Sequence, residues 1–299
     1  MNCQRSNNSL LLVLNPVAGK GKGKEILFET VALLTERGFR VTVLPTVSGG
    51  ETEKTIAEEC AKYGTVVAIG GDGTLNNVVN GIMQSGFDVP LGYIPLGSTN
   101  DFAKSLGLPK DIVSACDAIA NNEPKYIDLG LCGERYFVYI ACAGMFADTS
   151  FKTSQKMKNT LGHSAYLLKG ATSLTHMKKM HFEVECDGEE FDGDFILVAV
   201  SSTHSVGGVF KFPKDEVVFD DGMFELTLIK APKNLTEAMT LVNTLMHGSL
   251  SGDLFITRKA KRVSFLSGVG NEWSLDGENG GSMKSTHIEI KEKALRFIY

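Results

Sequence analysis

The sequence predicts an α/β fold followed by a mainly β part: an N-terminal Rossmann-like domain with a parallel sheet, and a C-terminal antiparallel β-sandwich. Three observations support this prediction. Short apolar runs alternate with amphipathic stretches up to about residue 129, as in βαβ units. Strand-like segments dominate from about residue 130 to 290. The length of 299 residues suits two domains of about 150 residues each. We expect one domain at 1–129 plus 290–299 and the other at 130–289.

Hydrophobic spacing predicts the elements of the first half. Ile26, Leu27, Val31 and Leu34 fall on one helical face, and Gly38 ends that helix. The expected strands are Leu10–Leu14, Phe39–Leu44, Val66–Ile69 and Leu91–Pro95. The other expected helices are Glu51–Tyr63, 75–83, Asp101–Leu106 and Asp111–Ala120. Because the carboxyl ends of parallel strands share one edge, we expect a ligand of this half to bind there.

The second half shows mainly strand signals. Asp187-Gly188 lies between two strand-like segments, His181–Cys186 and Glu190–Val200, which predicts a hairpin. Two helical stretches interrupt the strands, at about 154–177 and at Asn234–His247. Further strands are expected at Phe224–Ile229, Lys261–Leu266 and His287–Lys291.

Composition and charge exclude several classes of protein. The net charge of −5 argues against a general affinity for nucleic acid. No apolar run reaches the ~18 residues that a membrane span needs. A single Arg5 before five apolar residues is too little for a secretory signal. The six cysteines include no Cys-x-x-Cys pair, which favours reduced, buried thiols in a cytoplasmic protein.

Three glycine-rich segments follow expected strands of the first half. Gly70–Thr74 opens the helix at 75–83, so its backbone amides can approach a phosphate. Asp72 within it repels phosphate, and its natural partner is a divalent cation or a water network. The alternative for this segment alone is a tight turn with a solvated Asp72.

The other two segments are less specific alone. Gly97–Asp101 offers hydroxyl and amide donors, although helix capping explains the same residues equally well. Asn15–Lys24 resembles a P-loop, but Gly23-Lys24 is followed by Glu25 instead of Ser or Thr. A solvated flexible loop is the alternative there. Because all three segments end strands of one parallel sheet, their donors are expected to converge, and a nucleoside triphosphate is the simplest common ligand.

The order of these motifs resembles one known family. Asn15-Pro16-x-x-Gly19, Gly70–Asn76 and Gly97–Ala103 look like the catalytic-domain motifs of the soluble diacylglycerol kinase family, which includes bacterial lipid kinases and the sphingosine and ceramide kinases. NAD kinases share the Gly-Gly-Asp-Gly-Thr sequence, so this motif alone does not distinguish the two families. The Asn-Asp-Phe-Ala sequence and the Asp-Gly-Glu sequence near the C-terminus favour the lipid kinases. Later segments that fit are Gly207-Gly208, Asp220–Phe224 and Leu275–Glu278. The resemblance extends from about Leu10 to the end of the sequence.

The resemblance implies an ATP-dependent lipid kinase, which transfers the γ-phosphoryl group to a lipid hydroxyl, with diacylglycerol giving phosphatidic acid as the first expectation. It implies that Asp276 is the base, with Glu278 near the nucleotide. It also implies Mg²⁺ on the Asp221 carboxylate and the carbonyls of Val218 and Met223, a geometry that suits a hard cation. The implied ATP contacts are Asn15, Pro16, Val17, Ala18, Gly19, Thr46, Gly70, Gly71, Asp72, Gly73, Thr74, Leu75, Asn76 and Thr99.

Phosphoryl transfer needs positioning and charge neutralisation more than covalent help. We therefore expect Asp276 to accept the proton of the lipid hydroxyl while Mg²⁺ and the loop amides balance the developing charge. The alternative for Asp276-Gly277-Glu278 is an exposed hairpin turn.

The expected location is the cytoplasm, in peripheral contact with the inner face of the membrane, and a homodimer is compatible with the family.

A lipid substrate requires contact with a bilayer surface. No acidic residue lies between Asp148 and Glu183. The lysines of this stretch are Lys152, Lys156, Lys158, Lys169, Lys178 and Lys179. They predict docking on anionic lipid, at up to about 1 kcal/mol each. A helix packed on the β domain, with a solvated lysine face, is the alternative. The basic run Arg258–Arg262 is interpreted as protection of an edge strand.

Two other functions stay open from the sequence. One is a kinase for another acceptor, namely a sphingoid lipid, phosphatidylglycerol or NAD. The other is a protein that binds nucleotide or lipid without catalysis. The presence of Asp72, Asp276 and Glu278 together argues against the second, because a binding protein needs no base.

Overall fold

The computed structural model describes residues 8–145, 174, 178–202, 205–206, 210–211 and 218–299. The chain divides into two compact units. Unit 1 comprises Met1–Leu129, Arg135–Val138 and Lys291–Tyr299, and unit 2 comprises Gly130–Glu134 and Tyr139–Ile290. Arg135–Val138, which we had expected in the second domain, thus belongs to unit 1.

Unit 1 is built on parallel strands. The strands β1 (Ser9–Leu14), β2 (Arg40–Pro45), β3 (Thr65–Gly70) and β4 (Leu91–Pro95) pair in the order β4-β3-β1-β2. Every pairing among them is parallel. β3 is buried along its whole length, as expected for a strand covered on both faces. The four strands lie where the apolar runs predicted them, and all four carboxyl ends meet at one edge.

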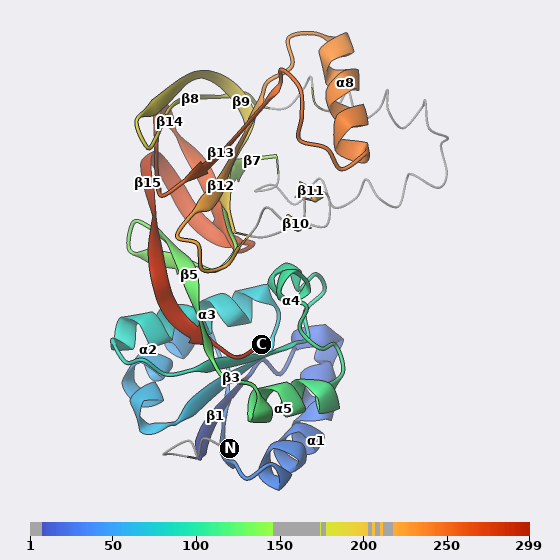
Figure 1. Ribbon diagram of the computed structural model, residues 1–299, viewed down its shortest axis with the longest axis vertical. Coiled ribbons are helices and arrows are strands. Elements are labelled where there is room, and N and C mark those ends of the chain that lie inside the picture. Colours follow the sequence, from blue (N-terminus) through green and yellow to red (C-terminus); the bar gives the residue numbers. More distant parts are fainter. Residues whose placement is uncertain (1–7, 146–173, 175–177, 203–204, 207–209, 212–217) are drawn as a thin grey trace. The chain divides into compact units, whose positions relative to one another are not determined.

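Helices cover both faces of this sheet (Figure 1). The helices α1 (Lys22–Glu36) and α5 (Ile112–Asn121) lie on one face, and α2 (Gly49–Glu59) and α3 (Asp72–Ser85) lie on the other. Leu12 of β1, Leu34 of α1 and Ile119 of α5 share one core cluster. Shorter helices are η1 (Ala18–Gly21), η2 (Cys60–Lys62) and α4 (Asp101–Leu106).

Unit 2 is built on antiparallel strands. β9 (Glu189–Ser201) and β14 (Arg262–Leu275) each pair with β7 (Ile140–Gly144) along one half and with β8 (Met180–Cys186) along the other. Phe182, Phe265 and Trp273 pack edge-on in the core, with ring centroids 5.1–6.4 Å apart. The remaining elements are β10 (Ser205–Val206), β11 (Phe210–Lys211), β12 (Phe224–Lys230), α8 (Leu235–Met246), β13 (Phe255–Ala260) and β15 (Glu278–Phe297). The end of β15, from Lys291 on, belongs to unit 1.

Three expectations for unit 2 can be compared with the structure. The turn Asp187-Gly188 joins β8 to β9 as a hairpin. β13 lies at the end of the strand order and carries Arg258 and Lys259, as expected for a protected edge. The helix expected at 154–177 lies outside the described residues except for the buried Leu174.

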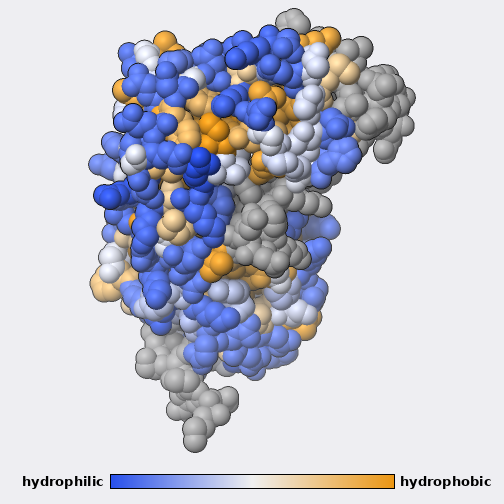
Figure 2. All heavy atoms as spheres, turned by 45° about the horizontal axis from the view of Figure 1, so that its top comes forward, coloured by the Kyte–Doolittle hydropathy of each residue, from blue (hydrophilic) through white to orange (hydrophobic). Residues whose placement is uncertain are grey.

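Several strands of the structure were not predicted from the sequence. The hydrophobic pattern did not reveal β5 (Lys125–Cys132), β6 (Arg135–Phe137), β7, β10, β11 or β13. Within the described ranges, no helix is long and apolar enough to cross a membrane. Hydrophilic residues dominate the face drawn in Figure 2, and hydrophobic residues form separate small patches on it. The described cysteines are free and buried: Cys60, Cys116, Cys132, Cys142 and Cys186.

Candidate functional site

The candidate site of unit 1 is formed by the turns that follow β1, β3 and β4. The turn after β3 leads directly into α3, whose N-cap is Gly71. A Cβ atom at Gly70 would collide with the side chain of Thr74, so this tight strand-to-helix turn requires glycine. The first amides of α3 have no partners within the helix, which makes its N-terminus a suitable place for an anion.

Direct contacts bring these turns together. The Asn15 Nδ2 donates to Thr74 Oγ1 at 3.2 Å, which joins the turn after β1 to α3. The Thr99 Oγ1 donates to Asp72 Oδ2 at 3.2 Å, which joins the turn after β4 to the same helix. A Cβ at Gly97 would lie 2.6 Å from the Cα of Gly71, so these two backbones touch. The sequence prediction that the three turns converge agrees with this geometry.

Asp72 is the most perturbed carboxyl group of this site. Its residue is 9% exposed, and its Oδ1 has no hydrogen-bond partner among the described residues. Burial and the charge of Asp101 raise the pKa of Asp72 above its ordinary value, although hydrogen bonds from Thr99 and from the backbone of Asn100 and Asp101 oppose the shift. A divalent cation would satisfy the unpartnered oxygen and offset the repulsion between the two carboxylates.

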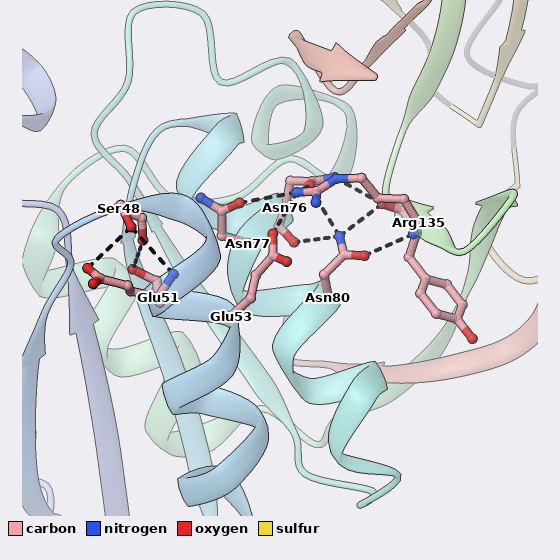
Figure 3. A network of polar contacts seen from close by, with 9 residues as sticks. Ser48, Glu51, Glu53, Asn76, Asn77, Asn80 and Arg135 are labelled. Carbon is pink, nitrogen blue, oxygen red and sulfur yellow. Dashed lines mark hydrogen bonds and ion pairs between the residues drawn. The ribbon is translucent and has the colours of Figure 1, made fainter. Parts of the chain in front are cut away.

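Asp101 was not among the predicted site residues, although the motif contains it. It is 3% exposed and opens α4, where Lys104 Nζ lies 3.4 Å from its Oδ1. Asp72 and Asp101 are thus two buried acids whose charges interact, and Asp101 would join Asp72 at a cation only if Lys104 moved away. Figure 3 shows other polar contacts of this unit, on α2 and α3.

The turn after β4 is held by Asn100. This residue has φ of 50°, and its side chain does not cap α4. Instead, its Oδ1 accepts from the Gly97 amide at 2.8 Å and its Nδ2 donates to the Gly97 carbonyl at 2.9 Å. The alternative of helix capping therefore does not describe the role of Asn100. Tyr93 of β4 also links this region to β3, because its hydroxyl donates to the Gly70 carbonyl at 3.1 Å.

The turn after β1 lies beside β2. Asn15 Oδ1 accepts from the Val17 amide at 3.1 Å, and the exposed Val17 is followed by η1. A Cβ at Gly19 would lie 3.0 Å from Leu96, which follows β4. Thr46 continues β2, and its amide donates to the Leu14 carbonyl at 2.8 Å. Pro16, Ala18 and Thr46 are partly exposed.

Two predicted ATP contacts, Leu75 and Asn76, are fully buried within unit 1. The side chain of Asn76 donates to the Tyr136 carbonyl at 3.1 Å and accepts from Arg135, so it faces β6. Gly73 is partly buried on the first turn of α3. Of this motif, the helix start and Asp72 are therefore better placed for a ligand than Leu75 and Asn76.

In unit 2, Asp276 and Glu278 belong to the turn between β14 and β15. Asp276 is only 2% exposed, whereas Gly277 and Glu278 of the same hairpin turn are exposed, so the alternative of an exposed turn does not describe Asp276. Its Oδ1 accepts from the amides of Tyr139 and Ile140 at 2.9 and 3.0 Å. Burial, together with the charge of Asp276, raises the pKa of Cys142 to about 12. Glu278 is exposed.

The predicted cation ligands of unit 2 are Val218, Asp221 and Met223. Asp221 Oδ1 accepts from the Met223 amide at 3.1 Å, and its Oδ2 lies 3.2 Å from Lys259 Nζ. The carboxylate is thus already paired, so these groups do not fit a cation unless Lys259 moves away. Within the described part of the chain, no group of three His, Cys, Asp or Glu residues could hold a metal ion.

Both halves of the chain match known protein families. Residues 9–132 match the diacylglycerol kinase catalytic domain, and residues 140–299 match the YegS C-terminal NAD kinase beta sandwich-like domain. The expected β-sandwich is therefore supported.

Individual relatives agree with the family matches. The diacylglycerol kinase of Bacillus subtilis (strain 168) is 33% identical over 282 residues, which cover 93% of this chain and 92% of that protein. That of Staphylococcus carnosus (strain TM300) is 33% identical over 288 residues, with 94% and 92% covered. A crystal structure of a diacylglycerol kinase from Bacillus anthracis str. Sterne shares the fold, with a TM-score of 0.75, 22% identity and coverage of 98% and 97%. The chain is a kinase of lipid metabolism and belongs to the diacylglycerol kinase family.

Proposed function

We propose that this protein uses ATP to phosphorylate a lipid hydroxyl, and that diacylglycerol is the acceptor, which gives phosphatidic acid. The observation that carries the proposal is the convergence of three glycine-rich turns on the start of α3, linked by the Asn15–Thr74 and Asp72–Thr99 hydrogen bonds. Similarity to relatives named diacylglycerol kinase supports the choice of acceptor.

Each group has a defined task in this proposal. The amides at the start of α3 bind and orient the triphosphate, and the Thr99 hydroxyl orients the Asp72 carboxylate beside it. Asp72 and Asp101 would hold Mg²⁺, which when bound neutralises charge on the phosphates. Asp276 accepts the proton of the lipid hydroxyl. The two amides on its Oδ1 hold its carboxyl group in one orientation.

The location proposed is the cytoplasm, with peripheral contact at the inner face of the membrane. Of the six lysines proposed to dock on anionic lipid, Lys178 and Lys179 are described, and both are exposed. The other four lie outside the described residues. A homodimer is a further proposal that rests on the family alone.

The experiment is an ATP-consumption assay with a panel of acceptors in mixed micelles: diacylglycerol, a sphingoid base, phosphatidylglycerol and soluble NAD. We expect turnover with diacylglycerol and none with NAD. Turnover with another lipid would replace the acceptor and keep the lipid kinase. ATP binding without turnover on any acceptor would favour a protein that binds without catalysis.

Two variants test the base within the same assay. Asp276→Asn keeps an oxygen for the amides of Tyr139 and Ile140 and removes the basic carboxylate, so we expect kcat to fall at least a hundredfold. Glu278→Gln is the matched comparison on the same turn, and a smaller loss is expected there. A larger loss with Glu278→Gln and near wild-type turnover with Asp276→Asn would move the base to Glu278.

A further inference from the structure

Helix α3 carries polar contacts that the proposed reaction does not use. Past the turn that starts the helix, the side chains of Asn76, Asn77 and Asn80 point toward Arg135 (Figure 3). Glu53 of α2 points toward the same guanidinium. We refer to the contacts of these side chains of α3 and α2 with Arg135 and Tyr136 of β6 as the α3–β6 clamp.

Asn80 binds the backbone of β6 as a neighbouring strand would. Its Oδ1 accepts from the Tyr136 amide at 2.9 Å, and its Nδ2 donates to the Tyr136 carbonyl at 3.0 Å. Asn80 is 1% exposed and also donates to the side chain of Asn76 at 3.2 Å. One buried side chain therefore contacts both polar groups of Tyr136. Its loss would remove the acceptor of the Tyr136 amide, while Asn76 would still donate to the carbonyl.

Arg135 joins this contact to α2. Its Nη2 lies 2.6 Å from Glu53 Oε1, 3.1 Å from Asn76 Oδ1 and 3.3 Å from Asn77 Oδ1. The side chain of Glu53 is only 10% exposed, so the ion pair is partly desolvated and its charge needs this partner. Two helices thus hold one short strand in place.

The same segment of chain continues to the residues that hold Asp276. Three positions after Tyr136, the amide of Tyr139 donates to Asp276 Oδ1, and the amide of Ile140 does the same. The residues between them, Phe137 and Val138, are 0% and 1% exposed. The Asp276 amide also donates to the Ile140 carbonyl at 2.9 Å. One end of this connection is fixed by α3, and the other end fixes the proposed base.

We infer that Asn80 and Arg135 are positioning residues for phosphoryl transfer, acting through the connection 136–140 on Asp276. This inference rests on the proposed function. Within unit 1, the clamp holds Arg135 and Tyr136, where this connection begins, on α3, the helix whose start is proposed to bind the phosphates. Neither side chain is assigned a contact with substrate, so their loss is expected to affect turnover more than ATP affinity.

The kinetic test compares Asn80→Ala and Arg135→Lys with the wild-type protein and with Ile82→Val. Ile82 is a buried residue of the same helix outside the clamp, and its shortening costs about 0.5–1.5 kcal/mol, which makes it a control for general destabilisation. Per folded protein, we expect kcat to fall at least tenfold in both clamp variants, with KM for ATP within twofold. The Ile82→Val variant should keep both constants. Unchanged kcat in the clamp variants would overturn the inference.

A double-variant cycle tests the route through Asp276. In the Asp276→Asn background, adding Asn80→Ala is expected to lower kcat less than twofold further, because both changes affect one unit. A full additional tenfold loss would overturn the route. Arg135→Lys keeps a cation beside Glu53, so it serves if Asn80→Ala fails to fold.

Hydrogen exchange separates this inference from the proposed function. Asn80→Ala is expected to speed exchange at the amides of Tyr139 and Ile140 at least tenfold, whereas Ile82→Val should not. Unchanged exchange would overturn the clamp even in an active kinase. Lack of lipid kinase activity in the wild-type protein would instead overturn the proposed function.

Discussion

The Thr99 hydroxyl donates to the Asp72 carboxylate at 3.2 Å across 27 positions of sequence. This bond joins the turn after β4 to the first residue of α3. It also opposes the effect of burial and of Asp101, which raise the pKa of Asp72. The hydrogen bond from Thr99 therefore favours the charged form of Asp72 at the start of a helix where a phosphate is proposed to bind, and a cation would favour the charged form further.

Replacing Asp72 by Asn is expected to abolish activity and to stabilise the fold at neutral pH. The pKa of Asp72 is raised in the folded state, so the folded chain keeps the Asp72 proton to a higher pH than the unfolded chain does. The free energy of unfolding therefore falls as the pH rises from the ordinary pKa of 3.8 through the folded-state pKa. Asp72→Asn removes that loss. We expect a higher Tm at pH 7, by about 2–4 °C for each kcal/mol gained.

Thermal unfolding without Mg²⁺ and nucleotide checks this expectation. The advantage of Asp72→Asn should disappear below the ordinary pKa, where the carboxyl group is protonated in both states. A lower Tm at pH 7 would contradict an ionisation penalty at Asp72.

Thr99→Val is expected to weaken ATP binding about tenfold or more. The change removes, at nearly constant volume, the donor that orients Asp72 for the Mg²⁺ proposed to accompany ATP, and a hydrogen bond to a charged group contributes about 1.5–3 kcal/mol. Thr99→Ser keeps the hydroxyl and is the matched control, with affinity close to wild type. Titration calorimetry with ATP measures both. Equal ATP affinities in the two variants would show that the Thr99 hydroxyl does not contribute to ATP binding.

The sequence was informative about unit 1 because its signals there are local. Each strand is a short apolar run that ends at glycine or polar residues, and α4 follows its motif within the predicted bounds. The need for glycine in these turns arises mostly within one short segment of the chain. At Gly70, for example, a Cβ atom would collide with Thr74, four residues later. Convergence of the turns followed from parallel strands alone.

The sequence was less informative where partners are distant. β6 has three residues, too few for a pattern, and Arg135 finds its partners 58–82 positions earlier. The repeat of Asn76, Asn77 and Asn80 on one helical face was the available signal for that clamp. β14 shifts register between Leu266 and Asn271, so alternation predicted only its first part.

Gly97→Ala is expected to abolish tight ATP binding and to lower Tm. A Cβ there would lie 2.6 Å from the Gly71 Cα and 2.6 Å from Asn100 Oδ1, and a backbone atom cannot move away as a flexible side chain can. Gly50→Ala is the matched control, because a Cβ at Gly50 of α2 meets nothing within 4 Å. Alanine in that helix should leave ATP affinity unchanged and raise stability by up to about 1 kcal/mol. Similar ATP affinity in both variants would argue against a nucleotide at this close approach.

Lys259 is expected to compete with any cation at Asp221. Its ammonium lies 3.2 Å from Asp221 Oδ2, where the resemblance placed Mg²⁺. A unit charge at about 4 Å contributes about 1 kcal/mol in water, so Lys259→Met should tighten Mg²⁺ binding about fivefold. The measurement is the rise of Tm with Mg²⁺ in the absence of nucleotide, with an equal concentration of a monovalent salt as reference. Adding Asp221→Asn to Lys259→Met should remove the gain, since the only carboxylate of the predicted ligand set is then lost. A rise of Tm that survives Asp221→Asn would place the cation elsewhere, with Asp72 and Asp101 as the next pair of acids to test.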